Sequence, residues 1–332
     1  MEAYVNRLSD VPQSDEPGRR HAYCNAGFSI LARICECVFD RNWDEAIQAL
    51  VAEPSEMDGY VGGPHALPEY ANFAEGHVPG KSGKPELVPL TSHRFLAPAG
   101  GGPMARVGDM SAFAAVMLSD GVSRSGNRVL SRRWTRLMKT RWVTGPAATF
   151  ASAWGLGTML HDWTNGVSLY GHDGVVLGQS FFFRLHDPSQ SAIIIMLNGG
   201  LADGFAEDVF RRVFAPILGG APAPLPQPID MDPIHLDRFT GVYAAPSARI
   251  SVSARGKALI AAYTFLGSAA GDPTTMEVDL APVSDDLFLA SFPNRRSPLL
   301  QRFQDFDDRQ RPHVLNFRGR AFHREAGIGQ AQ

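Results

Sequence analysis

The sequence predicts an α+β fold, with an antiparallel sheet flanked by helices and followed by a small all-β barrel or sandwich. Three observations predict it. Apolar residues recur at helical spacing before Trp154, and short strand-like segments between Gly, Asn, Asp and Pro turns follow it. A stretch rich in Pro, Ala and Gly, residues 219–233, then precedes further alternating segments. We therefore expect one domain over 1–218, a linker over 219–233 and a β-barrel domain over 234–325.

The helices are predicted from apolar residues three and four positions apart. The first presents Phe28, Leu31 and Val38 on one face, so it is expected to be amphipathic. Asp109 is placed to cap a later helix. Residues 53–98 are rich in Pro and Gly and show neither helical nor strand periodicity of apolar residues. This indicates a long irregular loop of the kind that often lines a site. Helices are expected over 26–39, 43–51, 110–118, 131–139 and 203–217.

The strands are predicted where turn residues bound short apolar runs. The run from Ala192 to Leu197 has no polar alternation, so both its faces should be covered, as in a central strand packed between helices. The strands before it are expected to be its antiparallel neighbours, because the turns that join them are short. Strands are expected over 154–160, 168–170, 179–185 and 192–197 and, beyond the linker, over 249–252, 258–265 and 276–280.

Composition excludes several classes of function. The net charge is −3, and the Lys and Arg residues are scattered, so we expect no nucleic-acid partner. The longest apolar runs are far too short to cross a bilayer, and the acidic Met1-Glu2-Ala3 start is not typical of a signal peptide. Three cysteines near the start do not describe a disulfide framework. We expect no cofactor, and the sequence does not indicate an oligomeric state.

Two short motifs are candidates for chemistry. Tyr23-Cys24-Asn25 stands immediately before the first expected helix, and Gly171-His172-Asp173-Gly174 lies on or beside a strand. Each motif alone is most simply a packing feature, since tyrosines before helices and single histidines are common in cores. Their order in the chain, together with the segments between them, gives them more weight.

Four segments in order resemble the serine β-lactamase and penicillin-binding-protein-like family, especially its class C and esterase-like branch. The first is similar to the family's Tyr-x-Asn motif, and the last resembles its Lys-Thr-Gly position, where esterase-like members often carry His-x-Gly. The resemblance covers roughly residues 20–218. The segments are Tyr23 to Phe28, Leu96 to Gly102 with Gly108-Asp109-Met110, Trp154 to Gly157, and Gly171 to Gly174 with Gly178-Gln179-Ser180.

The resemblance implies a role for each site residue, in acyl-enzyme hydrolysis of a small-molecule or peptide ester, amide or lactam. Tyr23 would be a proton relay beside the nucleophilic serine, and Asn25 would orient the substrate. His172 would donate a hydrogen bond or help proton transfer. Gly174 would keep the strand edge clear, and the backbone amide of Val175 would supply one oxyanion donor.

The sequence departs from the family at the nucleophile. None of its four lysines has a serine three residues before it, so it contains no Ser-x-x-Lys, and only 22 residues precede Tyr23. We therefore expect a truncated or degenerate hydrolase that is inactive by itself. The alternative is a non-catalytic protein that keeps the cleft for binding. We also expect one unpaired sheet edge and partly uncovered apolar faces at 181–183 and 193–195. DNA just upstream should then encode two strands and a helix with Ser-x-x-Lys.

Two other readings concern the His-Asp dipeptides and the last domain. Three dipeptides begin at His161, His172 and His186 and suggest a metal site or a phosphohydrolase, but they fall at strand ends and turns, so we expect no metal. Asp173 is expected to be a turn or solvent contact. The segment from Leu236 to Tyr243 resembles the opening of a lipocalin-like domain. We favour a packing role for that domain over a role in roofing the site.

Overall fold

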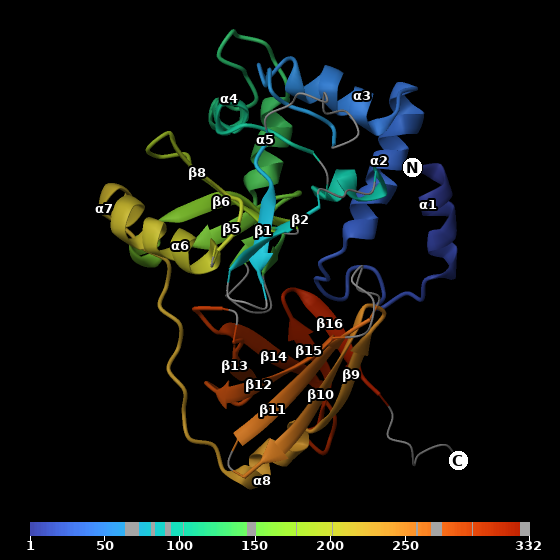
Figure 1. Ribbon diagram of the computed structural model, residues 1–332, viewed down its shortest axis with the longest axis vertical. Helices are drawn as coiled ribbons and strands as arrows, with labels where there is room; N and C mark the ends of the chain where they lie inside the picture. Colours follow the sequence, from blue (N-terminus) through green and yellow to red (C-terminus); the bar gives the residue numbers. More distant parts are fainter. Residues whose placement is uncertain are drawn as a thin grey trace. The chain divides into compact units, whose positions relative to one another are not determined.

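The contacts of the chain divide it into two compact units in this computed structural model (Figure 1). The larger unit comprises Met1–Pro12, Cys24–Val143 and Ala153–Pro222, and the second comprises Gln13–Tyr23, Thr144–Ser152 and Ala223–Gln332. The structure describes residues 1–63, 73–80, 84–89, 94–101, 103–144, 151–176, 178–200, 202–256, 258–266, 274–293 and 295–325.

A six-stranded sheet in the order β3-β4-β5-β6-β7-β8 forms the centre of the larger unit. From β4 to β8 every neighbouring pair is antiparallel, which confirms that the expected strands are antiparallel neighbours. The single strand expected over 154–160 is wrong, because a turn divides it into β4 and β5, which pair with each other. β6 and β7 pair over seven residues, as do β7 and β8, with Tyr170 of β6 opposite Leu185 and Val176 opposite Gln179. The strands are β3 (Val143–Thr144), β4 (Ala153–Trp154), β5 (Met159–Asp162), β6 (Ser168–Val176), β7 (Gln179–His186) and β8 (Ser191–Leu197).

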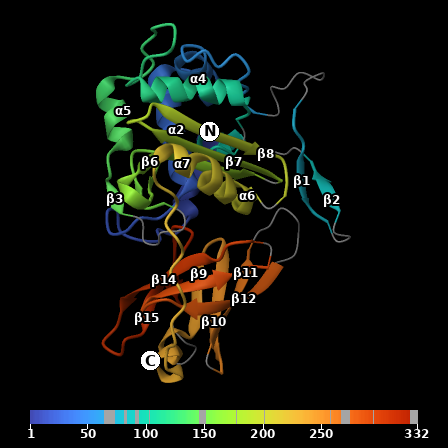
Figure 2. The ribbon, with the colours of Figure 1, turned by 90° about the vertical axis from the view of Figure 1, so that its left-hand side faces the viewer.

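Helices cover both faces of this sheet (Figure 2). Residues of α4 pack with Tyr170, Phe183 and Leu185 on one face, and residues of α6 and η6 pack with Phe182 and Ile193 on the other. The alternation of side chains along a strand produces these two separate cores. The helices are α4 (Val107–Leu118), α5 (Arg132–Lys139), α6 (Ala202–Val209), η6 (Phe210–Phe214) and α7 (Ala215–Leu218), and η5 (Thr164–Gly166) is a single turn.

The expectation of uncovered apolar faces on β7 and β8 is wrong for four of its six residues. Phe182, Phe183, Ile193 and Ile195 are all buried, because α4 and α6 lie against them. The faces of β8 are thus covered as expected, but β8 is the last strand of the described sheet and not a central one.

The first expected helix is present as α2 (Asn25–Phe39), but its apolar face is exposed. Only Ser29 and Ala32 are buried, whereas Leu31 is 55% exposed and Val38 is 69% exposed. The periodicity predicted the helix correctly, and the described residues do not cover its apolar stripe. Before and after it lie α1 (Glu2–Asn6), η1 (Arg7–Asp10), α3 (Trp43–Ile47) and η2 (Gln48–Ala52).

The stretch expected to be irregular, 53–98, contains a small hairpin. The strands β1 (Gly76–Pro79) and β2 (Pro85–Val88) pair with each other, and η4 (Arg94–Ala99) follows. The amide of His77 donates to the carbonyl oxygens of Asn198 (2.9 Å) and Gly178 (3.2 Å), which attaches the hairpin near the ends of β7 and β8. Residues 64–72, 81–83 and 90–93 of this stretch lie outside the described residues.

The second unit contains a closed barrel of eight strands, in agreement with the expected all-β domain. Large aromatic side chains, including Phe239, Tyr243, Tyr263, Phe288 and Phe303, are fully buried in its core. Side chains therefore fill the interior, as is usual in small barrels. Its elements are α8 (Pro233–Leu236), η7 (Asp237–Phe239), β9 (Gly241–Ala245), β10 (Ala248–Arg255), β11 (Ala258–Phe265), β12 (Thr274–Pro282), β13 (Leu287–Ser291), β14 (Leu299–Phe306), β15 (Pro312–Phe317) and β16 (Arg320–Arg324).

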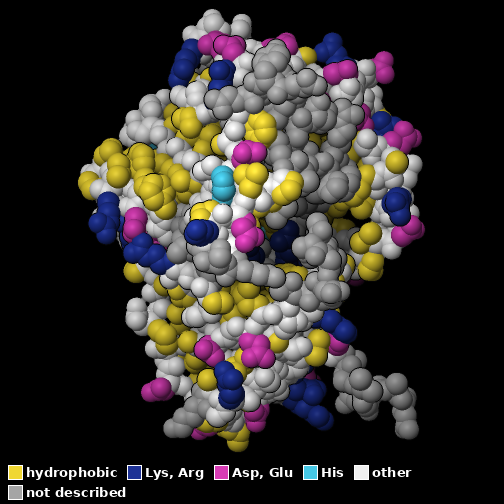
Figure 3. All heavy atoms as spheres, viewed as in Figure 1, with side chains coloured by type: hydrophobic (Ala, Val, Ile, Leu, Met, Phe, Trp, Pro, Cys, Tyr) yellow, Lys and Arg dark blue, Asp and Glu magenta, His cyan; other side chains and the backbone are white. Residues whose placement is uncertain are grey.

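The surface of the larger unit carries an apolar patch over α6 and α7. Figure 3 shows hydrophobic side chains gathered there, and Phe205, Val213 and Ile217 are each at least half exposed. Among the described residues, the structure contains no helix with the length and hydropathy needed for a membrane span.

Candidate functional site

His172 lies in the middle of β6, opposite Phe183 of β7. Its ring packs against Trp154 of β4, with 5.8 Å between the ring centroids and 62° between the planes. His172 therefore stands on the α4 face of the sheet, because the core on that face contains Phe183 and residues of α4. Trp154 is aromatic and apolar, so it shields one side of the His172 ring from water.

The protonation of His172 follows from two contacts. Its Nδ1 lies 2.6 Å from the carbonyl oxygen of Asp173, which can only accept a hydrogen bond, so Nδ1 carries the proton of the neutral ring. The pKa of His172 is lowered from its ordinary value by burial and by the charge of Arg184, against the opposing effect of Asp173. A neutral ring with its lone pair on Nε2 can accept a proton, which is what a general base requires.

Asp173 is not the turn or solvent contact that we expected. Its carboxylate forms an ion pair with Arg184 of β7, whose two terminal nitrogens lie 2.5 and 2.8 Å from Asp173 Oδ1 and Oδ2. The Arg184 side chain is only 5% exposed and also stacks over the Phe210 ring at 5.4 Å. Asp173 therefore points away from His172, toward the helix-covered face on the other side of β6.

The glycines of the motif have different roles in the backbone. A side chain at Gly171 would clash with the carbonyl oxygen of Phe183, so this position requires glycine. A methyl group at Gly174 would only touch Phe181, at 3.6 Å, an ordinary van der Waals contact. Val175, which follows, is 66% exposed and lies opposite Ser180. Packing thus explains Gly171 and leaves Gly174 without a structural reason to be glycine.

The structure brings together His172, Gly174 and Val175 on one strand, and it places Tyr23 and Asn25 in different units. Asn25 is the first residue of α2 in the larger unit. Tyr23 is the last residue of a segment, Gln13–Tyr23, that belongs with the barrel.

Tyr23 is held by the hairpin between β15 and β16. Its amide donates a 2.8 Å hydrogen bond to the Gly319 carbonyl oxygen, and the Arg320 guanidinium lies 5.0 Å from the centre of its ring. Charge pairs tie the rest of the segment to the same unit. Arg20 pairs with Asp15 (2.5 Å) and with Asp305 of β14 (2.6 Å).

The three His-Asp dipeptides have a shared structural explanation. Each aspartate is ion-paired to a basic side chain: Asp162 to Arg141 (2.6 Å), Asp173 to Arg184, and Asp187 to Lys139 (2.9 Å). Among the described residues, no three His, Cys, Asp or Glu side chains are arranged to hold a metal ion. These pairs join β5, β6 and β7 to neighbouring elements.

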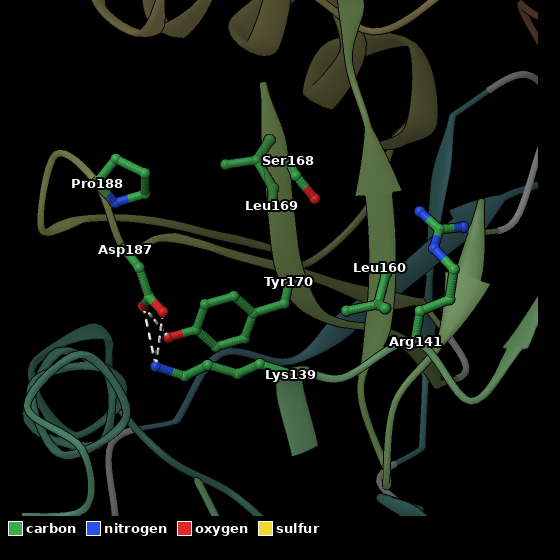
Figure 4. A pocket seen from close by; sticks show the side chains of 8 residues that line it. All are labelled: Lys139, Arg141, Leu160, Ser168, Leu169, Tyr170, Asp187 and Pro188. Carbon is green, nitrogen blue, oxygen red and sulfur yellow. Dashed lines mark hydrogen bonds and ion pairs between the residues drawn. The ribbon is translucent and has the colours of Figure 1, made fainter. Parts of the chain in front are cut away.

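One of these pairs lines a pocket of about 240 Å³ (Figure 4). Lys139, Tyr170 and Asp187 point toward one another there, and the Tyr170 hydroxyl donates to Asp187 at 2.7 Å. Burial and the neighbouring Asp187 carboxylate raise the pKa of Tyr170, so the phenol stays protonated. Lys139 and Asp187 neutralise each other in the pocket, so we interpret this cluster as an anchor of α5 on the sheet.

Sequence reasoning missed Arg184. An arginine in the apolar run Phe181-Phe182-Phe183-Arg184-Leu185 is unusual, because a buried charge needs a partner. That signal alone indicates that some carboxylate must face it. The partner is identified only once the register of β6 against β7 is known.

The family model described as Beta-lactamase matches residues 2–215 of the chain. Penicillin-binding protein 4 of Amycolatopsis lactamdurans is 33% identical over 247 residues, which cover 70% of this chain and 62% of that protein. The chain thus spans less than two thirds of the length of this curated relative.

Two solved structures share the fold over nearly the whole chain. The crystal structure of SurE aligns with a TM-score of 0.73 at 24% identity, covering 97% of this chain and 72% of that one. The octameric penicillin-binding protein homologue from Pyrococcus abyssi aligns with a TM-score of 0.55 at 18% identity, covering 97% and 67%. At these identities the likeness concerns the fold.

Proposed function

The chain belongs to the beta-lactamase family of hydrolases, and from that premise we propose that it carries part of an acyl-transfer site for an ester, amide or lactam. The observation that carries the proposal is the state of His172. Its ring is neutral, its Nδ1–H is held by the Asp173 carbonyl oxygen, and its Nε2 is the basic atom. Such a histidine can move a proton to or from a reacting group near neutral pH.

The other site residues receive the roles implied by the family resemblance. Tyr23 relays a proton, and Asn25 orients the substrate through its side-chain amide. The backbone amide of Val175 donates to the developing oxyanion. Gly174 supports this assignment. No described contact requires a glycine at this position, whereas a substrate bound beside His172 would require the space that a side chain would fill. The substrate is a small molecule or a peptide.

We further propose that this polypeptide does not complete the reaction by itself. The sequence contains no Ser-x-x-Lys, the segment that carries the nucleophile in the family, and loss of a nucleophile typically costs many orders of magnitude in rate. The test is to incubate the purified chain with a fluorescent penicillin and with a fluorophosphonate, and to measure its intact mass. We expect no covalent adduct and no burst with a chromogenic lactam or a short-chain ester. A labelled serine would overturn this part of the proposal.

The second candidate function is a non-catalytic binding protein, and the same missing motif favours it. The two candidates differ in what His172 does. In a binding protein, an acyl ligand should bind with similar affinity to the natural chain and to His172→Ala, and adding a family segment with Ser-x-x-Lys should create no activity. If the chain instead carries part of an acyl-transfer site, adding the Ser-x-x-Lys segment should produce acylation, and His172→Ala should greatly slow that acylation.

A further inference from the structure

The ion pair between Arg184 and Asp173 joins β6 to β7 directly beside the candidate base His172. Arg184 Nη1 and Nη2 reach both oxygens of the Asp173 carboxylate, at 2.5 and 2.8 Å, and Nη1 also donates to the Phe183 carbonyl oxygen at 2.9 Å. A two-pronged arginine–carboxylate pair fixes direction as well as distance. At 5% exposure the Arg184 side chain is nearly dry, so this pair is little screened by water.

This ion pair acts on the same residue that holds His172. The Asp173 side chain is held by Arg184 on the α6 face, while the Asp173 carbonyl oxygen accepts from His172 Nδ1 at 2.6 Å. Fixing the side chain limits rotation of the Asp173 backbone, and the close approach of Gly171 to Phe183 limits the backbone on the other side of His172. The orientation of the acceptor for Nδ1–H is thereby set from the far side of the sheet.

We propose that Arg184 and Asp173 are positioning residues that fix the tautomer and the orientation of the His172 ring. The importance of His172 for chemistry rests on the function proposed above, whereas the positioning itself is a property of this chain that can be measured without turnover. Arg184 and Asp173 act through His172, and neither is proposed to touch the substrate.

The charges around His172 give the two residues opposite electrostatic effects. The Arg184 guanidinium lowers the pKa of His172, and the Asp173 carboxylate raises it. His161 of β5 also interacts electrostatically with His172, and burial holds the pKa of His161 well below its ordinary value. Trp154 and Phe183, which pack on the same face, carry no charge.

The test is nitrogen-15 NMR of the His172 ring in the full chain, which reports the tautomer and the titration midpoint together. The natural chain should show the Nδ1–H form. Arg184→Met should raise the titration midpoint and weaken the preference for Nδ1–H, and Asp173→Asn should lower the midpoint. Arg184→Lys keeps the positive charge but cannot make the bidentate contact with the Asp173 carboxylate. Its titration midpoint should therefore stay close to that of the natural chain, while its preference for the Nδ1–H tautomer should weaken.

Two further variants keep the result interpretable. Arg211→Met removes a partly exposed ion pair with Glu207 on the helices over the same face, and it should leave both signals of His172 unchanged. If Arg184→Met fails to fold, the double variant Arg184→Met/Asp173→Asn, which buries no net charge, takes its place. An unchanged tautomer and midpoint in folded Arg184 and Asp173 variants would overturn the proposal. If the tautomer responds but acyl chemistry is never found, the positioning stands and the proposed function fails.

Discussion

The backbone amide of Tyr23 donates a 2.8 Å hydrogen bond to the carbonyl oxygen of Gly319. This contact makes the approach to the Tyr23-Cys24-Asn25 motif part of the barrel unit, although the two residues are far apart in sequence. The barrel unit therefore holds the backbone of Tyr23 in place through this hydrogen bond.

Arg20→Met should loosen the segment that ends at Tyr23. Arg20 is the partner of Asp15, whose side chain is 8% exposed, so its removal leaves a nearly buried carboxylate poorly paired, at a cost of about 1–3 kcal/mol. Hydrogen exchange of the Tyr23 amide should accelerate, and the free energy of unfolding should fall. Arg19→Met is the matched control, because the Arg19 side chain is 59% exposed, and it should change stability by less than about 0.5 kcal/mol. Equal effects of the two variants would contradict this account.

Gly174→Ala and Gly171→Ala should separate function from packing within one motif. The methyl group at Gly174 meets only Phe181 at an ordinary distance, so this variant should unfold at nearly the natural temperature. Gly171→Ala forces the methyl group into the Phe183 carbonyl and should be strongly destabilising. Thermal unfolding by circular dichroism measures both. A large loss of stability in Gly174→Ala would show that this glycine is structural.

The stability of the larger unit should fall on acidification through the range where histidine titrates. Burial lowers the pKa of both His161 and His172 in the folded state below the ordinary 6.5. Below about pH 6.5 the unfolded chain therefore binds more protons than the folded chain. The contribution of these two histidines to the free energy of unfolding is fully present above that pH and is lost as the pH falls. Urea unfolding between about pH 7.5 and 5.5 should show the loss. His161→Gln should reduce the dependence, and a change at the exposed His313 should not.

Tyr23→Phe and His172→Ala should each slow acylation roughly a hundredfold or more in a protein that combines this chain with a family segment carrying Ser-x-x-Lys. This is the magnitude expected for groups that move protons in the transition state. Rapid-quench measurement of the acyl-enzyme gives the rate directly. Cys24→Ser is the control, because the middle residue of Tyr-x-Asn has no implied contact with the substrate. Unchanged rates in both test variants would remove these residues from the mechanism.

The segment from Ile234 to Glu325 should fold when it is expressed alone. It contains all eight strands of the closed barrel and the aromatic residues of its core. Far-ultraviolet circular dichroism and a cooperative thermal transition would establish this. Because the fragment lacks Gln13–Tyr23, we expect it to be less stable than the barrel in the full chain. A disordered spectrum would refute the proposed boundary at residues 219–233.

Elements with local signals could be predicted from the sequence, and those that depend on distant pairing could not. The turns and apolar runs around β7 and β8 gave their positions, and the alternation after residue 234 gave the barrel. The hairpin of β1 and β2 was missed because Pro79, Gly80 and Pro85 interrupt any strand pattern. The exposed stripe of α2 was missed because periodicity predicts a face and does not supply its partner.

The candidate site also combines residues that local motifs predict with contacts that depend on distant pairing. Motif order led to His172 and Gly174, but the partner of Asp173 depends on the register of β6 against β7. That register places Arg184 opposite Gly171, two residues along β6 from Asp173 on the same face. The assignment of Tyr23 to the barrel depends on a contact with Gly319 across nearly the whole chain. Such non-local contacts leave no spacing in the sequence to read.

The closure of the barrel is uneven around its circumference. Strands β10 and β11 pair over eight residues, whereas β16 and β9 meet over two, His323 with Ala244 and Arg324 with Tyr243. The Arg324 guanidinium reinforces this seam by donating to the carbonyl oxygens of Arg238, Thr240 and Pro312. Mechanical or thermal stress should therefore open the barrel at this seam first, turning a continuous cylinder into a curved sheet with two free edges. At this seam the backbone ladder is short and is supplemented by the Arg324 side chain and by the hydrogen bond from the Glu325 amide to the Val242 carbonyl oxygen.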